Sequence, residues 1–191
     1  MNMIKLLVGL GNPGREYEQT RHNAGVWFIE ALLKEAGARL KPENKLRASS
    51  NKIEFSGHTL RVAVPMDYMN LSGQSVAALQ HYYKIEAEET LIIHDEIDLM
   101  PGTARIKFSG GEGGHNGLRS IAAATGTKAF YRLRIGVGHP GRRQQVVNYV
   151  LGKPSADETV LIDQSIEKAL TVLPAILDGA IEKAMTQLHT A

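Results

Sequence analysis

The chain of 191 residues contains no cysteine. This absence excludes disulfide bonds, thiolate zinc sites and cysteine nucleophiles. The sequence also lacks any apolar run near the roughly 18 residues that a membrane-spanning helix needs. The apolar stretch at the N-terminus is too short for the core of a signal peptide, and no small-residue cleavage site follows it. We therefore expect a cytoplasmic protein with no membrane segment.

The chain as a whole also lacks an excess of one charge sign, because its net charge is only +2. The charges are nevertheless distributed unevenly. Residues 102–143 contain eight basic residues and one acidic residue, which gives this block a net charge of +7, and acidic segments lie on both sides of it. Two interpretations remain open: an ordinary solvated surface, or a surface shaped for a polyanion such as nucleic acid.

Strand-like and helix-like patterns alternate along the sequence. Apolar runs predict strands at residues 4–10, 90–94, 104–108 and 131–137, and the segments 52–56 and 59–64 flank a hairpin turn at Gly57-His58. Helical spacing predicts helices at 24–36, ending at Gly37, and at 71–83 and 116–124. This alternation, in a chain of one-domain length, predicts a single α/β domain over residues 1–191 with a twisted, mixed but mostly parallel sheet flanked by helices.

The C-terminal part of the sequence has a helical pattern. Ser155 and Glu158 have the spacing of a capping box, which begins a helix. Pro174 is expected to break or kink this helix, because proline lacks a backbone N–H and its ring clashes with the preceding turn. A last helix is then expected to carry Ile176, Ile181 and Met185.

Residues 9–14 match the G-x-G-x-x-G pattern of dinucleotide-binding proteins and follow a predicted strand. In that pattern a helix begins at the glycines, so that its N-terminus faces a pyrophosphate. Here residues 15–23 separate the glycines from any helical spacing, and Pro13 removes an N–H that a phosphate would need. We interpret the glycines as a turn that directs the side chain of Asn12.

Polar side chains gather just after predicted strands, where α/β sheets place their active sites. These segments are 12–23, 94–96 and 113–116, with Met69-Asn70 in a fourth loop. The chain has neither cysteine nor a G-x-S-x-G motif, so we expect water to be the nucleophile of a hydrolytic site. Histidine suits the base that activates water, a carboxylate fixes its tautomer, and asparagine amides hold the water or the developing oxyanion.

Each of these residues also has an ordinary interpretation. His22 could cap a helix or lie on the surface, and Asp95 could form a turn. Asn12 and Asn116 could likewise be turn or cap residues. A divalent cation could bind to a cluster of neighbouring side chains, namely His94, Asp95, Glu96 and Asp98, but no second ligand cluster has metal-site spacing. The residues alone thus indicate a hydrolase-like α/β domain with a candidate polyanion surface.

Five segments, in order along the chain, resemble the sequence signatures of bacterial peptidyl-tRNA hydrolases. They are residues 9–14 with Tyr17 and 20–25, then 65–73, 94–99, 113–118 and 134–141. With the residues between them, they cover the chain from Gly9 to about Gly152 and leave a less characteristic helical tail. The agreement of five segments in one order makes the resemblance specific.

The resemblance implies a monomeric α/β enzyme without a metal or cofactor. Its partner is peptidyl-tRNA, and it hydrolyses the ester between the peptide and the 3′ ribose of the tRNA. By position, His22 resembles the general base of the family and Asp95 its partner carboxylate. The resemblance also implies substrate-binding roles for Asn12, Tyr17, Met69, Asn70 and Asn116, and tRNA-binding roles for Arg105, Lys107 and Arg134.

Two positions depart from the family pattern. The basic pair begins with Arg105 where lysine is common, and the Gly-rich loop carries Glu112, which adds a negative charge near an anionic ligand. Two other functions are alternatives: a non-catalytic RNA-binding module of the same fold, and a nucleotide-cofactor enzyme built on the glycine motif. Retention of His22, Asp95 and the three asparagines argues against the first. Because Asp95 only orients the base, we also expect Asp95→Asn to slow turnover less than His22→Ala does.

Overall fold

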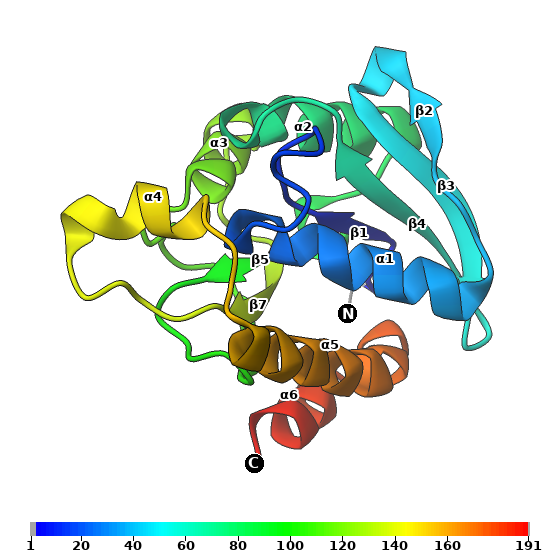
Figure 1. Ribbon diagram of the computed structural model, residues 1–191. Helices are drawn as coiled ribbons and strands as arrows, with labels where there is room; N and C mark the ends of the chain where they lie inside the picture. Colours follow the sequence, from blue (N-terminus) through cyan, green and yellow to red (C-terminus); the bar gives the residue numbers. More distant parts are fainter. Residues whose placement is uncertain (1–2, 191) are drawn as a thin grey trace.

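Seven strands form one mixed sheet in the computed structural model, which describes residues 3–190 (Figure 1). They are β1 (Leu6–Gly9), β2 (Lys41–Glu43), β3 (Ala48–Phe55), β4 (His58–Pro65), β5 (Thr90–Glu96), β6 (Ala104–Phe108) and β7 (Tyr131–Gly136), and their spatial order is β2-β3-β4-β1-β5-β7-β6. The central strands β4, β1, β5 and β7 pair in parallel, whereas β2, β3 and β6 add antiparallel pairs at the two ends. The prediction of a mixed α/β sheet is confirmed, with the parallel pairs at its centre.

Helices cover both faces of this sheet. They are α1 (Ala24–Ala36), α2 (Ser72–Tyr83), α3 (Asn116–Thr125), α4 (Val146–Val150), α5 (Ala156–Leu177) and α6 (Ile181–His189). α1, α5 and α6 pack on one face, and α2 and α3 pack on the other (Figure 1). None of the helices within residues 3–190 combines the length and apolar character that crossing a membrane requires.

The central strands are buried on both faces. In β1, Leu7 belongs to the core beneath α1 and α5, whereas Leu6 and Val8 belong to the core beneath α2 and α3. A strand covered on both sides needs apolar residues at every position, because successive side chains point to opposite faces. This explains why β1 and β5 appear in the sequence as continuous apolar runs.

The carboxyl ends of the parallel strands carry the polar segments that the sequence singles out. Asn12 follows β1, Met69 follows β4, and Asp95 is the penultimate residue of β5. Helix α1 begins only at Ala24, well after the glycines of residues 9–14. These glycines therefore do not open a helix, in agreement with the argument against a dinucleotide site.

Helix α1 approaches the central strands very closely at Gly25. A Cβ atom at this position would lie 2.2 Å from the carbonyl oxygen of Ile93 and 2.7 Å from the amide nitrogen of Leu10. Only glycine allows the backbones to come this close. Because the 3₁₀ turn η1 (Arg21–Asn23) directly precedes α1, this contact also fixes η1 against the end of β5.

The hairpin turn differs by one residue from its prediction. It consists of Ser56 and Gly57, which have φ values of 51° and 79°, and His58 already pairs with Phe55. Positive φ at both central residues is the geometry that matches the twist of a two-residue hairpin. Because Ser56 adopts this conformation, Gly57 takes the second position of the turn rather than the first.

Pro174 does not end the helix in which it lies. Helix α5 continues to Leu177 and therefore contains Ile176, which was expected in the last helix. Proline in the final turn removes a single hydrogen bond, and buried neighbours on both sides hold that turn in place. The chain leaves the helix at Gly179, with φ at 83°, before α6 begins. Strand β2 and helix α4, both very short, were not predicted.

Strand β6 forms one edge of the sheet, and α6 covers part of that edge. The Nε2 atom of His189 accepts a hydrogen bond of 3.0 Å from the backbone N–H of Ile106. Burial, together with the nearby cations Arg105, Arg134 and Lys168, lowers the pKa of His189. The ring therefore stays neutral near pH 7 and remains a hydrogen-bond acceptor.

Replacing Gly25 by alanine is expected to lower the unfolding temperature by several degrees. The added methyl group must displace α1 or β5, and overpacking of this kind costs about 1–3 kcal/mol, which corresponds to about 2–4 °C per kcal/mol in a domain of this size. Gly111→Ala is the matched control, because its Cβ would meet no atom within 4 Å and its φ is not positive. Calorimetry of both variants tests this, and equal unfolding temperatures would contradict the close contact.

Candidate active site

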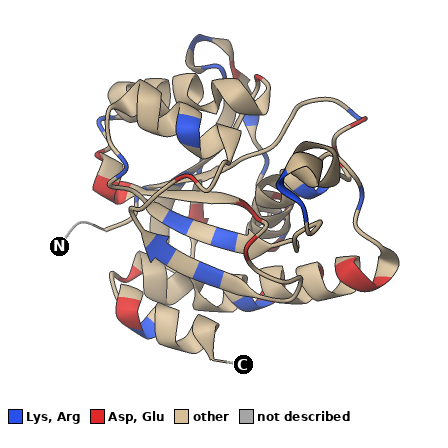
Figure 2. Ribbon diagram, turned by 90° about the vertical axis from the view of Figure 1, so that its left-hand side faces the viewer, with Lys and Arg blue, Asp and Glu red and all other residues tan. Residues whose placement is uncertain are grey.

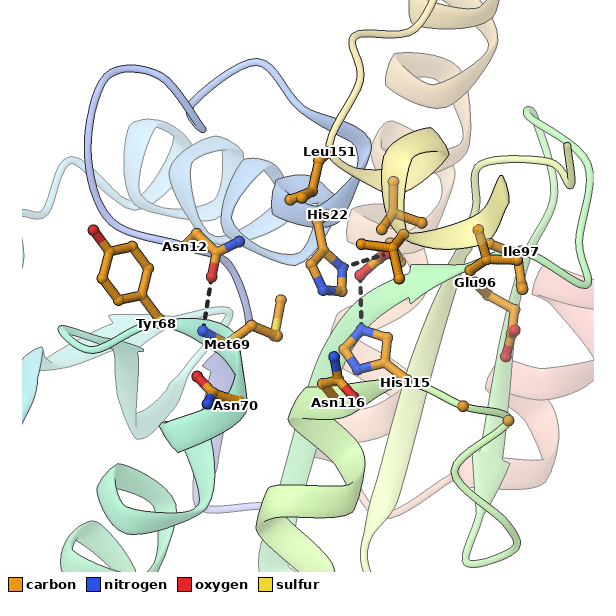
Figure 3. A pocket seen from close by; sticks show the side chains of 16 residues that line it. Asn12, His22, Tyr68, Met69, Asn70, Glu96, Ile97, His115, Asn116 and Leu151 are labelled. Carbon is orange, nitrogen blue, oxygen red and sulfur yellow. Dashed lines mark hydrogen bonds and ion pairs between the residues drawn. The ribbon is translucent and has the colours of Figure 1, made fainter. Parts of the chain in front are cut away.

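A cavity of about 290 Å³ opens at the carboxyl ends of the parallel strands (Figure 3). Its lining residues are Asn12, His22, Tyr68, Met69, Asn70, Asp95, Glu96, Ile97, Gly113, Gly114, His115, Asn116, Val146, Val147, Val150 and Leu151. The structure thus brings together both catalytic candidates and four of the five substrate-binding candidates. No serine, threonine or cysteine is among these residues.

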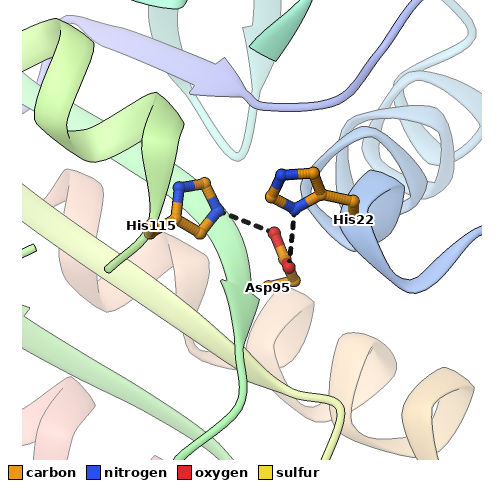
Figure 4. A group of neighbouring side chains, drawn as sticks. All are labelled: His22, Asp95 and His115. Atoms are coloured by element: carbon orange, nitrogen blue, oxygen red, sulfur yellow. Dashed lines mark hydrogen bonds and ion pairs between the residues drawn. The ribbon is translucent and has the colours of Figure 1, made fainter. Parts of the chain in front are cut away.

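The carboxylate of Asp95 is the central buried group of the cavity. Its Oδ2 atom lies 2.8 Å from Nδ1 of His22, and its Oδ1 atom lies 2.8 Å from Nε2 of His115 (Figure 4). The two imidazole centroids are 4.9 Å apart. One carboxylate therefore holds two histidines that come from distant segments of the chain.

The proton position on His115 follows from its backbone contacts. Its Nδ1 atom accepts hydrogen bonds from the N–H groups of Gly117 and Leu118, at 3.1 and 3.3 Å, so the ring caps helix α3. A backbone N–H can only donate, so Nδ1 carries no proton. The ring of His115 therefore has its proton on Nε2 and donates it to Asp95.

His22 has the opposite tautomer. An ionised carboxylate only accepts hydrogen bonds, so His22 donates its Nδ1 proton to Asp95 and keeps a lone pair on Nε2 when the ring is neutral. Burial opposes the charging of His22, but the charge of Asp95 and the hydrogen bond to it outweigh burial and raise the pKa of His22. The cavity thus contains a basic nitrogen whose protonated form Asp95 stabilises.

Asp95 stays ionised despite its burial. Burial alone would raise its pKa, but attraction to the protonated form of His22 and the hydrogen bonds from His22 and His115 outweigh burial and hold the pKa of Asp95 well below its usual range. The carboxylate is therefore ionised near pH 7, where it accepts a hydrogen bond from each histidine.

A third histidine, His94, lies beside this group and is only 1 % exposed. It donates its Nδ1 proton to the backbone carbonyl of Asp95, at 2.8 Å. Burial, reinforced by the neighbouring His115, lowers the pKa of His94 to about 3, so this ring is neutral near pH 7. Its Nε2 atom has no hydrogen-bond partner among the described residues.

The ligand-type atoms of His22, Asp95 and His115 lie within 4.8 Å of one another, which is close enough to consider a metal ion. A metal-bound histidine usually donates its second ring N–H to a partner. The second nitrogen of His115 instead accepts two backbone hydrogen bonds, so its proton occupies Nε2, where a metal would need a lone pair. The three residues therefore fit a hydrogen-bonded triad better than a metal centre. The cation cluster suggested around His94 and Asp98 does not form within residues 3–190.

Asn12 joins two of the loops that frame the cavity. Its Oδ1 atom accepts a hydrogen bond of 2.7 Å from the backbone N–H of Met69. Asn23 holds Asn12 through two further hydrogen bonds, to its backbone N–H and carbonyl, at 2.8 and 3.0 Å. Because the side-chain oxygen is engaged, the amide nitrogen of Asn12 is the group left to face a substrate, and Figure 3 shows it turned toward His22.

The other substrate-binding candidates differ in their placement. Asn116 is the first residue of α3, and Asn70 lies in the 3₁₀ turn η3 (Met69–Leu71), where its side chain is exposed. Tyr17 does not line the cavity. It packs edge-on against Tyr68, with ring centroids 6.0 Å apart, so it can affect the cavity only through Tyr68.

Sequence reasoning missed the role of His115 and the apolar wall of the cavity. The wall consists of Val146, Val147, Val150 and Leu151, in or next to α4. Arg21 holds the segment that contains α4 beside His22. Its Nη1 donates to the carbonyl of Tyr149 at 2.9 Å, and its guanidinium stacks 3.9 Å from the centroid of the Tyr149 ring. Helix α4 is too short to give a periodic signal. The sequence places His115 in the polar segment 113–116 and in a signature segment, but neither of these indicates its contact with Asp95.

A basic face lies on the antiparallel pair β6–β7. Arg105 is directly opposite Arg134, and Lys107 is directly opposite Arg132, so bands of basic residues lie side by side on two neighbouring strands (Figure 2). Residues two apart on a strand point to the same side, so all four share one face. The three tRNA-binding candidates, Arg105, Lys107 and Arg134, are therefore brought together.

The four basic residues are not equally available. Arg134 donates to Glu96 at 2.9 Å, and the buried Arg132 donates to the carbonyls of Gly110 and Gly111. Arg105 and Lys107 are exposed. Like charges directly opposite each other on paired strands destabilise the pairing. In β7, Arg134 pairs with Glu96 and Arg132 donates to backbone carbonyls, whereas the two cations of β6 face solvent.

A buried carboxylate that contacts a basic histidine, in a cavity without a serine, threonine or cysteine side chain, is an arrangement typical of hydrolases that activate water. The family model for peptidyl-tRNA hydrolase matches residues 6–191. The peptidyl-tRNA hydrolase of Stenotrophomonas maltophilia (strain R551-3) is 52% identical over 187 residues, which cover 98% of this chain and 97% of that relative. The enzyme of Chromohalobacter salexigens is 50% identical over 191 residues, with coverage of 100% and 98%.

The crystal structure of peptidyl-tRNA hydrolase from Acinetobacter baumannii superimposes with a TM-score of 0.96 at 46% identity, and the match covers 100% of this chain and 97% of that one. The chain belongs to the peptidyl-tRNA hydrolase family. It is a hydrolase that acts on the ester bond of peptidyl-tRNA.

The two histidines that contact Asp95 are expected to show opposite tautomers. Above its raised pKa, His22 should carry its proton on Nδ1, whereas His115 should carry its proton on Nε2. Long-range ¹H–¹⁵N correlation spectra distinguish the two forms, and His94, with its proton on Nδ1, provides an internal reference. The same tautomer at His22 and His115 would contradict the network.

Proposed function

We propose that His22 is the general base for ester hydrolysis and that Asp95 orients it. The observation that carries this proposal is the 2.8 Å hydrogen bond between them, which leaves Nε2 of His22 as an acceptor in the cavity. Nε2 takes a proton from a water molecule, and the water oxygen attacks the ester carbonyl carbon. When the tetrahedral intermediate collapses, His22 returns the proton to the departing 3′ oxygen of the ribose, and the products are free tRNA and a peptide carboxylic acid.

Asn12, Asn70 and Asn116 are proposed to bind the ester group and the attacking water. The amide nitrogen of Asn12 suits a developing oxyanion, because the hydrogen bond from Met69 holds the oxygen of the same side chain away. Met69 is 3 % exposed and forms an apolar part of the cavity. Tyr17 contributes by supporting Tyr68.

The basic face is proposed to bind phosphates of the tRNA. Arg105 and Lys107 present exposed charges on one side of β6, and such contacts add affinity and fix register without touching the ester. Arg134 contributes from β7, where Glu96 keeps its guanidinium in a defined position.

The proposal also includes a monomeric, cytoplasmic enzyme that needs neither a metal nor a cofactor. One chain supplies every group in the proposed reaction, and the substrate belongs to translation. The tautomer of His115 supports chemistry that depends on hydrogen bonds rather than on a metal ion.

Replacing His22 by alanine is expected to lower kcat by about 10²–10⁴-fold, the contribution of a positioned base. Binding of tRNA should survive, because the basic face is unchanged. In the unmodified enzyme, kcat/KM should fall as the pH drops through the raised pKa of His22, since a protonated ring cannot accept a proton, and this acid limb lies above the ordinary value of 6.5. Hydrolysis of a defined peptidyl-tRNA across this pH range measures both effects. Normal turnover by the variant would exclude His22 as the base.

Asp95→Asn is expected to be as damaging as His22→Ala, which reverses the ranking expected from the sequence alone. Asparagine offers one acceptor and one donor, and His115, whose tautomer α3 fixes, takes the acceptor. The amide NH₂ then faces Nδ1 of His22 and favours the tautomer protonated on Nε2, which cannot act as a base. A wrong tautomer costs about 10⁴-fold in kcat in a comparable histidine–carboxylate pair.

Asp95→Ala is the matched comparison, because it leaves His22 free to adopt either tautomer. It should therefore retain more activity than Asp95→Asn, provided that circular dichroism shows both variants to be folded. Higher activity in the asparagine variant would show that His115 does not fix the orientation of residue 95.

Replacing Arg105 and Lys107 together by alanine is expected to raise KM for full-length peptidyl-tRNA while kcat changes little. The salt dependence of kcat/KM should also flatten, by up to about 0.7–0.9 in log–log slope for each phosphate that the variant no longer binds. Lys41→Ala with Lys52→Ala is the control, because it removes the same charge from exposed positions on β2 and β3 at the opposite end of the sheet. Equal losses in both double variants would mean that net charge, rather than this face, attracts the tRNA.

A further inference from the structure

Asn116 and Gly117 form the single Asn-Gly pair of the chain, and Asn116 lines the active-site cavity (Figure 3). Asparagine is thermolabile, because the backbone nitrogen of the next residue can attack its side-chain amide carbon. That nitrogen loses its proton, ammonia leaves, and a five-membered succinimide forms, which water then opens to aspartate or isoaspartate. Glycine favours the attack, since it has no side chain to shield its nitrogen. The cavity thus contains a site at which the chain can modify itself.

Gly117 cannot be exchanged for a less reactive neighbour of Asn116. A Cβ atom at position 117 would lie 2.6 Å from Sδ of Met69 and 2.9 Å from Cδ1 of Leu10, and both of these side chains are buried. The packing of α3 against the segments after β1 and β4 therefore requires glycine. Asn116 is in turn proposed to bind the ester. Packing and substrate together fix the reactive pair, so its protection has to come from the conformation of the chain.

The first turn of α3 opposes the closure of the succinimide ring. Asn116 is the first residue of this helix and Gly117 the second. Ring closure turns the nitrogen of Gly117 toward the side chain of Asn116, which requires Asn116 to leave the helical ψ. That rotation breaks the hydrogen bonds that the N–H groups of Gly117 and Leu118 donate to Nδ1 of His115, at 3.1 and 3.3 Å. The cap formed by His115 therefore has to open before Asn116 can react.

We propose that Asn116 is a latent deamidation site and that the His115 cap of α3 keeps it intact. The ring of His115 then has two roles, because Nε2 donates to Asp95 while Nδ1 holds the first turn of the helix. Deamidation exchanges an amide donor for a carboxylate in the same cavity as the ionised Asp95, and a second negative charge opposes a developing oxyanion. This loss of activity rests on the function proposed for Asn116, whereas the modification itself does not.

The test follows deamidation of Asn116 in the full chain by mass spectrometry during incubation at mildly alkaline pH. Isoaspartate at position 116 identifies the succinimide route, since direct hydrolysis of the side chain gives only aspartate. The same chain unfolded in urea provides the rate of the sequence without its fold, and the native chain should react more slowly. Because ring closure is slow, its rate follows the population of the opened turn. His115→Ala should therefore accelerate the native reaction about 2- to 30-fold, the effect of losing an N-cap.

His115→Ser is the matched comparison, because serine accepts the same backbone hydrogen bonds at an N-cap. Both variants lose the contact with Asp95, but only the alanine variant loses the cap, so the serine variant should react nearly as slowly as the unmodified chain. Ser155→Ala controls for general destabilisation, since it removes the cap of α5 instead. It should leave the rate at Asn116 unchanged.

Equal rates in the native and the urea-unfolded chain overturn the proposal, and this comparison requires no variant to fold. Equal rates in His115→Ala and His115→Ser overturn it as well, because the cap would then not be the restraint. The same holds if Ser155→Ala accelerates the reaction as much as His115→Ala does. Failure of the function proposed for Asn116 is distinguishable, since it would appear as full esterase activity in a chain deamidated at this residue.

Discussion

The buried carboxylate of Asp95 is the group on which the rest of the site depends. Each of its oxygens accepts a hydrogen bond from one histidine. The first turn of α3 fixes the proton of His115 on Nε2, and the remaining carboxylate oxygen then leaves one arrangement for His22. The cap of α3 and the basicity of Nε2 of His22 therefore belong to one hydrogen-bonded network. The tautomer of His115 is thus set by backbone N–H groups of α3 rather than by another side chain.

The sheet supplies the rigidity that such a network needs. Parallel strands bring Asn12, Met69 and Asp95 to one edge, and the contact of Gly25 with Ile93 keeps η1 within hydrogen-bond reach of β5. Loops that would otherwise move independently are tied together by side chains, as Asn12 ties the loops after β1 and β4. Arg21 does the same for the apolar wall beside its neighbour His22. A site held on strand ends and cross-linked loops keeps its reacting groups in place before the substrate arrives.

Features with a local signal could be predicted from the sequence, and features that depend on distant contacts could not. The helices α1, α2 and α3 and the buried strands have clear periodicity, and the family resemblance pointed to His22 and Asp95. Pro174 stays inside α5, because packing outweighs the loss of one hydrogen bond. The role of His115 depends on a carboxylate twenty residues away, and the pairing of Arg134 with Glu96 depends on the register of β5 and β7. Neither the spacing nor the composition of the sequence contains that information.

The contact between His189 and the edge strand β6 has a consequence for how these molecules behave toward one another. An exposed edge strand offers a row of free backbone groups on which a strand of another molecule can add. The imidazole of His189 occupies the N–H of Ile106, and α6 packs against the same strand. Helix α6 therefore keeps this part of the β6 edge from pairing with a strand of another molecule. A chain without this helix would expose both the backbone groups of β6 and the core residues that α6 covers, so two surfaces would become available to another molecule.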